Sequence, residues 1–153
     1  MRLMKPSRKS KPDMSAKRKF PLRETSSPEI HCIGLLTDEP DYRVCWLLNR
    51  RYSLGLQRSG DLILAIARAP VPQSFTCFTS TGNTGNTLFK LISNRSNEGL
   101  WLTGFQQINF LFLSLIPGDK NDIMANLRQH GTGHIPEIRG IFDIPAHEIS
   151  SLL

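Results

Sequence analysis

A nine-residue apolar run, Ile108 to Ile116, most constrains how this chain can fold. Asn109 and Ser114 are its only polar residues. A membrane-spanning helix needs about 20 apolar residues, so the run is too short to cross a bilayer. Strands that are apolar at consecutive positions are usually covered on both faces. The run therefore predicts a central strand in a sheet with material packed on each side.

The segment Thr37 to Ser53 predicts the best helix of the chain. Asp38 or Asp41 is expected to cap its start, where acidic residues suit the positive end of the helix dipole, and Gly55 is expected to end it. Apolar residues recur at helical spacing and predict an inward face, made of Val44, Leu47 and Leu48 and widened by Cys45 and Trp46.

The remaining elements predict an α+β fold. Further strands are expected over residues 19–23, as an edge strand, and over 62–67, 74–81, 88–93 and 138–144. Residues 29–36 are apolar enough for either a strand or a buried segment that leads into the first helix. A second helix is expected over Asp122 to His130 and should end at Gly131, with Ile123, Met124 and Leu127 facing inward. The connections are mostly hairpin-like. We therefore expect a single domain with a mainly antiparallel sheet of five or six strands and two helices packed on one side.

The charge of the chain is divided unevenly between a tail and a body. Residues 1–19 carry eight basic side chains and one acid, whereas residues 20–153 carry 11 basic and 12 acidic side chains. Polar, charged and proline-containing segments cannot bury enough apolar surface to offset chain entropy. We therefore expect residues 1–17 to be a disordered basic tail and residues 18–153 to form the domain. Translation from Met14 is an alternative that would leave a shorter tail.

The tail has two interpretations. It is either a solvated, non-specific extension or an arm that binds RNA, DNA or anionic lipid, with salt-dependent affinity. It has no aromatic residue before Phe20 on which bases could stack. The arm candidates are Arg8, Lys9, Lys11, Lys17, Arg18 and Lys19.

No metal or cofactor site is expected from the sequence. Cys32, Cys45 and Cys77 are scattered, without a C-x-x-C pair, and predict buried thiols in a reducing compartment. His130 and His134 have a metal-like spacing but lack further ligands nearby, so we interpret them as structural or solvated. No apolar segment typical of a secretory signal follows the N-terminal charges, so we expect a cytoplasmic protein.

The turn Thr81 to Thr87, with sequence TGNTGNT, superficially suggests a phosphate loop. It lacks the Gly-Lys-Ser/Thr ending and joins two strands instead of opening a helix. We interpret it as the turn of a hairpin that spans residues 74–93.

Four polar residues of the first helix are the candidates for ligand or phosphate binding. They are Arg43, Asn49, Arg50 and Arg51. Arg43 and Arg50 lie seven positions apart and should project to the same outer side, where they could clamp a phosphate or carboxylate. The alternative is a solvated face on which Arg43 pairs with Asp38 or Glu39.

Several motifs carry a family resemblance. These are IGLLT (from Ile33), DYRVCWLLN (Asp41 to Asn49), L-x-R-x-x-D-L (Leu56 to Leu62), LISNRS (from Leu91) and INFL (from Ile108). Their order resembles the IPExxxVDY family, small proteins of unknown function found in Bacteroidota.

The naming motif of that family is degraded in this chain. By position it falls on Leu102-Thr103-Gly104 and Ile108-Asn109-Phe110, which keep the apolar character but lose both acids. A literal Ile-Pro-Glu at residues 135–137 lies too late in the chain, and we treat it as coincidence. The resemblance implies that the motif marks a strand and its entry turn, and it implies a bacterial cytoplasmic setting. It implies no activity.

The sequence therefore leaves three functional hypotheses. The first is a non-enzymatic protein-binding or regulatory module, because the body is nearly neutral and shows no catalytic signature. The second is an RNA-associated protein that uses the tail with Arg43, Arg50 and Arg51. The third is an enzyme whose site has no recognisable sequence signature.

Overall fold

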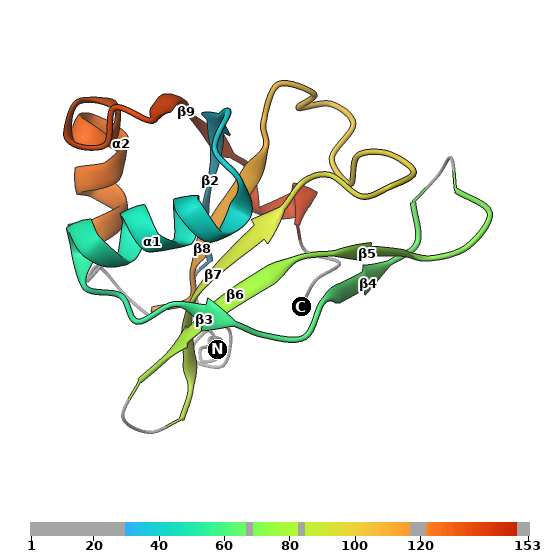
Figure 1. Ribbon diagram of the computed structural model, residues 1–153, viewed down its shortest axis with the longest axis horizontal. Helices are drawn as coiled ribbons and strands as arrows, with labels where there is room; N and C mark the ends of the chain where they lie inside the picture. Colours follow the sequence, from blue (N-terminus) through green and yellow to red (C-terminus); the bar gives the residue numbers. More distant parts are fainter. Residues whose placement is uncertain (1–29, 67–68, 83–84, 117–121, 150–153) are drawn as a thin grey trace, which may run out of the picture.

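The computed structural model describes residues 30–66, 69–82, 85–116 and 122–149. It contains two helices, a six-stranded sheet and a separate two-stranded sheet (Figure 1). The helices are α1 (Asp41–Tyr52) and α2 (Asp122–His134). The large sheet has the order β3 (Gln57–Arg58), β6 (Cys77–Thr81), β7 (Thr87–Ser93), β8 (Phe110–Ser114), β2 (His31–Thr37) and β9 (Ile138–Ile144). The small sheet pairs β4 (Leu62–Leu64) with β5 (Gln73–Phe75), and every named strand pair is antiparallel.

Strand β8 is the central strand that the apolar run predicted. It pairs with β7 on one side and β2 on the other, and all five of its residues are buried. Its side chains alternate between two hydrophobic cores, since Phe110 and Phe112 enter one and Leu111 and Leu113 the other. The prediction of a strand covered on both faces is confirmed.

Both helices cover the same face of the sheet. From α1, Val44 and Leu48 are completely buried against it, and from α2, Met124 and Leu127 are as well. They pack on the side of β8 that carries its phenylalanines, where Phe89 and Phe112 stack with ring centroids 5.6 Å apart. The predicted α+β architecture with two helices on one side is confirmed.

The second face of the sheet has a cover without α-helices. It consists of the β4–β5 pair, the connection between β7 and β8 (residues 94–109), and a short 3-10 helix at Ala146–Glu148. Phe75, Leu102, Ile108 and Ile149 are its buried apolar contacts with the sheet. The domain thus has two cores, one on each side of the large sheet.

Helix α1 begins later than predicted. Its N-cap is Pro40, which makes no side-chain capping hydrogen bond. Asp41 is the first helical residue, and its carboxylate accepts a 2.6 Å hydrogen bond from the Tyr42 N–H, so the expected acid is present in the first turn. The residue before a proline is disfavoured in helical conformation, so the helix cannot begin at Glu39. Asp38 and Glu39 form a bend after β2, and Pro40 is extended, with φ of −72° and ψ of 166°. At the other end Ser53, with φ of 53°, adopts the left-handed conformation that closes the helix, so Gly55 is not the terminating residue.

Helix α2 runs past the predicted end at Gly131, through to His134. A Cβ atom built at position 131 would lie 2.4 Å from Cδ1 of Ile141 on β9 and 2.9 Å from Cδ1 of Leu127. The glycine is therefore explained by the close approach of helix and strand and not by a cap.

Two strand predictions were also wrong in detail. Residues 62–67 were expected to form one buried strand, but β4 stops at Leu64 and Ile63 is 61% exposed. Residues 74–81 divide at Thr76 into β5 and β6, which belong to different sheets. Strands form in both segments, as predicted, but β4 and β5 leave the large sheet and pair with each other over its second face.

The basic tail, its arm candidates and the strand expected over residues 19–23 lie outside the described residues. Of the helices in the described part of the chain, neither is sufficiently long and apolar to span a membrane.

Candidate functional site

The outward side of α1 carries two exposed aromatic rings between arginines. Tyr42 is 69% exposed and Trp46 is 45% exposed. The guanidinium carbon of Arg43 lies 4.8 Å from the centroid of the Trp46 ring, and that of Arg50 lies 5.1 Å from it. These four residues, spaced to share one side of a helix, are called the outer face of α1 below.

Trp46 was expected to widen the apolar inward stripe, and this expectation was wrong. The inward side is already occupied by Val44, Cys45, Leu47 and Leu48, all buried. At 100° per residue, position 46 points between positions 42 and 50 and away from the sheet. The spacing of Tyr42, Trp46 and Arg50, four residues apart, was the sequence signal for this face.

Arg43 is held at the edge of the outer face by two carboxylates. Its Nε lies 3.7 Å from Glu39, one turn earlier, and its Nη2 lies 3.4 Å from Glu137. Glu137 is itself anchored, because its backbone carbonyl accepts a 2.7 Å hydrogen bond from the buried Thr37 hydroxyl. The predicted pairing of Arg43 with Glu39 is present, and Arg43 is largely neutralised.

Asn49 bridges two parts of the backbone and does not face a ligand site. Its Nδ2 donates to the carbonyl of Leu56 at 2.9 Å, and its Oδ1 accepts from the Leu56 N–H at 2.8 Å. Both halves of the amide are therefore occupied in fixing the chain after α1. This residue positions the end of the helix that carries Arg50 and Arg51.

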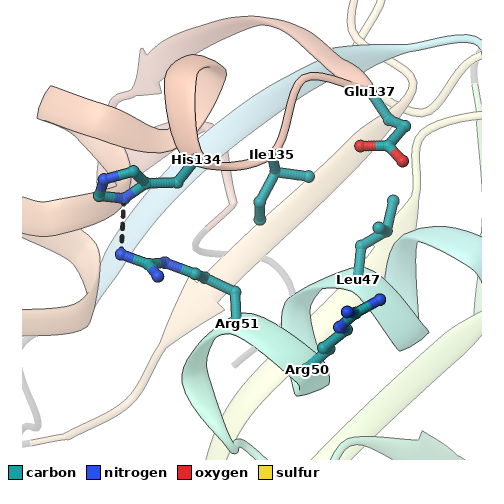
Figure 2. A pocket seen from close by; sticks show the side chains of 6 residues that line it. All are labelled: Leu47, Arg50, Arg51, His134, Ile135 and Glu137. Atoms are coloured by element: carbon teal, nitrogen blue, oxygen red, sulfur yellow. Dashed lines mark hydrogen bonds between the residues drawn. The ribbon is translucent and has the colours of Figure 1, made fainter.

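A pocket of about 370 Å³ lies between the C-terminal halves of the two helices (Figure 2). Its lining consists of Leu47, Arg50, Arg51, His134, Ile135 and Glu137. Figure 2 shows Arg51 pointing to His134 on one side, with Arg50 and Glu137 toward the other. Leu47 and Ile135 form an apolar floor because they are buried in the helix-side core. The structure thus brings together two of the four predicted ligand candidates, Arg50 and Arg51.

The polar contact within the pocket joins the two helices. Nη2 of Arg51 lies 2.8 Å from Nδ1 of His134. The guanidinium can only donate, so Nδ1 is the acceptor and carries no proton in this arrangement. Reduced solvation, the Arg51 charge and the nearby His130 all lower the pKa of His134. His134 is thus neutral around pH 7.

The histidine pair is placed differently from the predicted Gly-rich turn. His130 and His134 both lie on the last turns of α2, with ring centroids 5.3 Å apart. Within the described residues, no three His, Cys, Asp or Glu side chains gather to form a metal site. His134 and Glu137 were not predicted as pocket residues, since only the fold brings the end of α2 beside α1.

The three cysteines are buried and free, as predicted. Burial raises the pKa of the Cys32 thiol to about 12. Burial and then the Asp41 charge raise the pKa of Cys45. Thiols with raised pKa are poor nucleophiles at neutral pH, so the chemistry of Cys32 and Cys45 is that of small apolar side chains.

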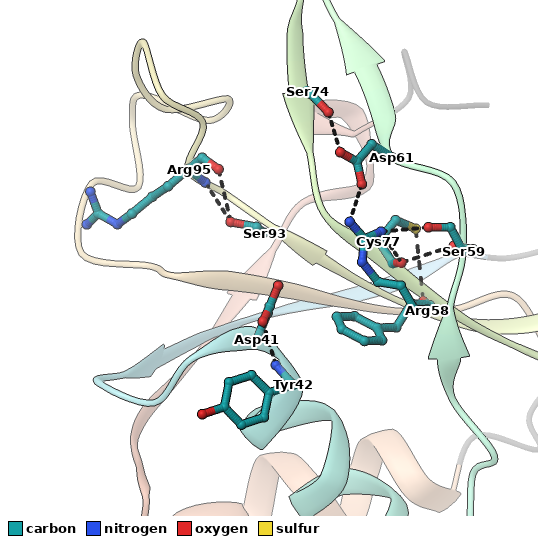
Figure 3. A network of polar contacts seen from close by, with 10 residues as sticks. Asp41, Tyr42, Arg58, Ser59, Asp61, Ser74, Cys77, Ser93 and Arg95 are labelled. Carbon is teal, nitrogen blue, oxygen red and sulfur yellow. Dashed lines mark hydrogen bonds and ion pairs between the residues drawn. The ribbon is translucent and has the colours of Figure 1, made fainter.

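A separate polar network ties the small sheet to the large one (Figure 3). The carboxylate of Asp61 accepts from the Ser74 hydroxyl on β5 and from the Arg58 guanidinium on β3. These hydrogen bonds, Ser74 first and Arg58 second, lower the pKa of Asp61. The network is exposed, and its residues lie outside the lining of the pocket between the helices, so we interpret it as a structural link between the two sheets.

Comparison with known proteins gives no match: no family model, curated protein or solved structure is significantly similar to this chain. The residues that the predicted resemblance would align with the IPExxxVDY motif, Leu102 to Gly104 and Ile108 to Phe110, lie in a turn at residues 101–104 and at the entry into β8. Leu102 and Ile108 are buried there. Asn109 accepts a 2.9 Å hydrogen bond from the Thr37 N–H through its side chain. In this chain these positions therefore have an architectural role.

Proposed function

We propose that this protein is a non-enzymatic binding module that docks an acidic segment of a partner protein on the outer face of α1. The observation that carries the proposal is the exposed Trp46 ring with the Arg43 and Arg50 guanidinium groups over it. Trp, Tyr and Arg dominate the binding energy of protein interfaces, where large rigid rings are buried and guanidinium groups pair with carboxylates.

Charge supports an acidic partner. Arg50 forms no ion pair with a carboxylate among the residues that the structure describes, whereas Arg43 already has two acidic neighbours. A partner carboxylate would give Arg50 the bidentate pairing that guanidinium groups favour. An apolar side chain beside that carboxylate would cover Tyr42 and Trp46.

RNA binding is the competing proposal and is less well supported by the described residues. A polyanion needs a run of uncompensated cations, but Arg43, Arg58, Arg128 and Arg139 are each paired with an acid. The predicted basic arm could supply that charge, but it lies outside the described residues. The experiment below therefore treats RNA as an outcome.

We further propose a bacterial cytoplasmic setting, in keeping with the motif resemblance and the three free cysteines. The resemblance itself stays a proposal and supplies no activity. The third hypothesis, an enzyme, gains no support from the pocket, because Glu137 is engaged by Arg43 and His134 by Arg51.

A photoactivatable phenylalanine analogue placed at position 42 in the native host should crosslink the partner, which mass spectrometry identifies. The purified partner is then titrated against Trp46→Ala. Loss of a central tryptophan typically costs about 2 kcal/mol or more of binding free energy, so we expect at least about 30-fold weaker binding.

Ile63→Ala is the matched control, because Ile63 is also an exposed apolar residue but lies on β4. It should bind within about twofold of the unmodified protein. Equal binding by Trp46→Ala and Ile63→Ala would refute the assigned face, and crosslinks to RNA alone would favour the competing proposal.

A further inference from the structure

The pocket between the helix ends contains more positive charge than its own acids neutralise. Arg50, Arg51 and His134 contribute donors from two helices, and Glu137 is the single carboxylate among the described residues that line it. That carboxylate is already 3.4 Å from the Arg43 guanidinium. Arg50 therefore faces the hollow without an acidic partner among the described residues.

The hydrogen-bond partner of Arg51 in this pocket is an unusual one. Arg51 donates to the neutral His134 ring at 2.8 Å, although a guanidinium forms its strongest hydrogen bonds with an oxyanion. Protonation of Nδ1 would remove the acceptor and place two positive groups in contact. Arg51 would then be released toward the pocket, and the pocket would gain one charge from the imidazolium.

We propose that this pocket binds the oxyanion group of a ligand, a carboxylate, phosphate or sulfate, between Arg50 and Arg51, and that protonation of His134 switches it to higher affinity. The lining suits such a group because it combines two arginine side chains with the apolar floor of Leu47 and Ile135. This inference goes beyond the docking proposal and does not depend on it.

The affinity for a simple anion should be modest. The pocket lies where both helices end, and the partial negative charge of a helix C-terminus opposes an anion. Glu137 opposes it as well. We therefore expect a dissociation constant of about 1 mM for inorganic sulfate at low salt, equivalent to about 4 kcal/mol of binding free energy.

The titratable and charged groups around His134 come from every element packed against it. Arg51 contacts it from α1, and His130 lies one turn earlier on its own helix. Arg50 and Glu137 line the other side of the same pocket. The pKa of His134 lies below its usual value of 6.5. An anion in the pocket would raise it, so the same ion should bind more tightly as the pH falls through this lowered pKa.

The test is a titration of the full chain with sodium sulfate, followed by NMR of the arginine side chains and the histidine rings. Sulfate keeps its charge over the range used, so any pH effect belongs to the protein. We expect affinity to be about threefold or more higher at about pH 5.5 than at about pH 7.5. Saturating sulfate should also raise the pKa of His134.

Variants separate the roles of the pocket residues. Arg50→Gln should weaken sulfate binding about tenfold, whereas Arg95→Gln removes an equal charge on the β7–β8 connection and should leave it unchanged. His134→Asn keeps an acceptor for Arg51 but cannot titrate, so the pH dependence should vanish. Glu137→Gln removes the opposing charge and should tighten binding.

Equal sulfate affinity for Arg50→Gln and Arg95→Gln would overturn the site. The switch would be overturned if the pH dependence of sulfate affinity persisted in His134→Asn but was abolished in His130→Asn. Glutarate and an acetylated tetraglutamate peptide amide distinguish a small ligand from a polypeptide source. If the peptide binds more tightly than glutarate and Trp46→Ala removes that advantage, the oxyanion belongs to a partner protein. If the peptide and glutarate bind equally, the oxyanion belongs to a small free molecule. Loss of partner docking with retained sulfate binding would refute only the proposed function.

Discussion

The two faces of the sheet are covered by different means. On one face, α1 and α2 pack apolar side chains such as Leu48 and Met124 into a core to which no described residue contributes a buried amide side chain. On the other, the irregular connection of residues 94–109 is fastened by Asn94, which is completely buried. Its Oδ1 accepts from the Leu102 N–H at 2.8 Å, and its Nδ2 lies 3.2–3.5 Å from the carbonyl oxygens of Leu102, Phe105 and Ile108.

The difference follows from backbone hydrogen bonding. A helix satisfies its own N–H and C=O groups, so it can cover a sheet with apolar contacts alone. An irregular segment has no such pattern, and each buried backbone group needs an external partner. One amide side chain supplies several partners here. The helix side is consequently free to present its outer surface, with Tyr42 and Trp46, for binding.

Among the variants that test this difference between the two faces, Asn94→Ala should cause the largest loss of stability. It leaves the Leu102 N–H and the Ile108 carbonyl without this partner, whereas the carbonyls of Leu102 and Phe105 keep their backbone hydrogen bonds from Phe105 and Ile108. At about 1–3 kcal/mol for each buried group, we expect at least about 2 kcal/mol of destabilisation. Chemical denaturation measures the loss, and hydrogen exchange should show lost protection in residues 95–109. Leu48→Ala on the helix face, at about 2–5 kcal/mol, should reduce protection throughout the domain. Loss of less than about 1 kcal/mol in Asn94→Ala would contradict the assigned role.

A medium effect is expected from Gly131→Ala on the helix side. Alanine has the better helix propensity, by about 1 kcal/mol, but its Cβ would lie 2.4 Å from Ile141. Overpacking typically costs about 1–3 kcal/mol, so we expect net destabilisation of about 1 kcal/mol, measured by thermal unfolding. Gly133→Ala is the control in the same helix, because nothing lies within 4 Å of its Cβ, and it should stabilise. Stabilisation by both variants would show that helix and strand do not approach closely.

The smallest effect is expected from Asp61→Asn, which weakens the join between the small sheet and β3. The pair is exposed, and such ion pairs contribute about 0.2–1 kcal/mol. Hydrogen bonds from Ser74 and Arg58 lower the pKa of Asp61 below 3.8. The contribution is therefore present above the unfolded-state pKa and is lost as the pH falls through the lower folded-state value. Stability curves of the variant and the unmodified protein should differ at pH about 6 and converge at pH about 2; a difference that persists at low pH would contradict the assignment.

Apolar patterning predicted the regular elements well. The central strand, the pairing of β6 with β7 and, apart from Trp46, the inward faces of both helices are as expected, because period and burial are linked directly. The helix ends were less predictable. Helix α1 begins only after Pro40. Helix α2 continues through Gly131, where a glycine is required by the close approach of Ile141, a residue on a strand that only the fold brings near.

The candidate site was predicted in part. Arg43 and Arg50 were expected on one outer side, and they lie there around Trp46. Asn49 was grouped with them, but its amide is committed to Leu56. The pocket partners His134 and Glu137 could not be assigned, because they lie more than 80 positions further along the chain.

The amino-acid sequence by itself determined which stretches are strands and helices and which of their sides are apolar, because these properties depend on spacing along the chain. Tertiary structure alone decided that the ends of α1 and α2 meet, that Asn94 lies in a buried hub and that Arg51 contacts His134. Those outcomes depend on strand order, in which β2 is inserted between β8 and β9. Strand order is set by the joint packing of distant segments, and no local pattern encodes it.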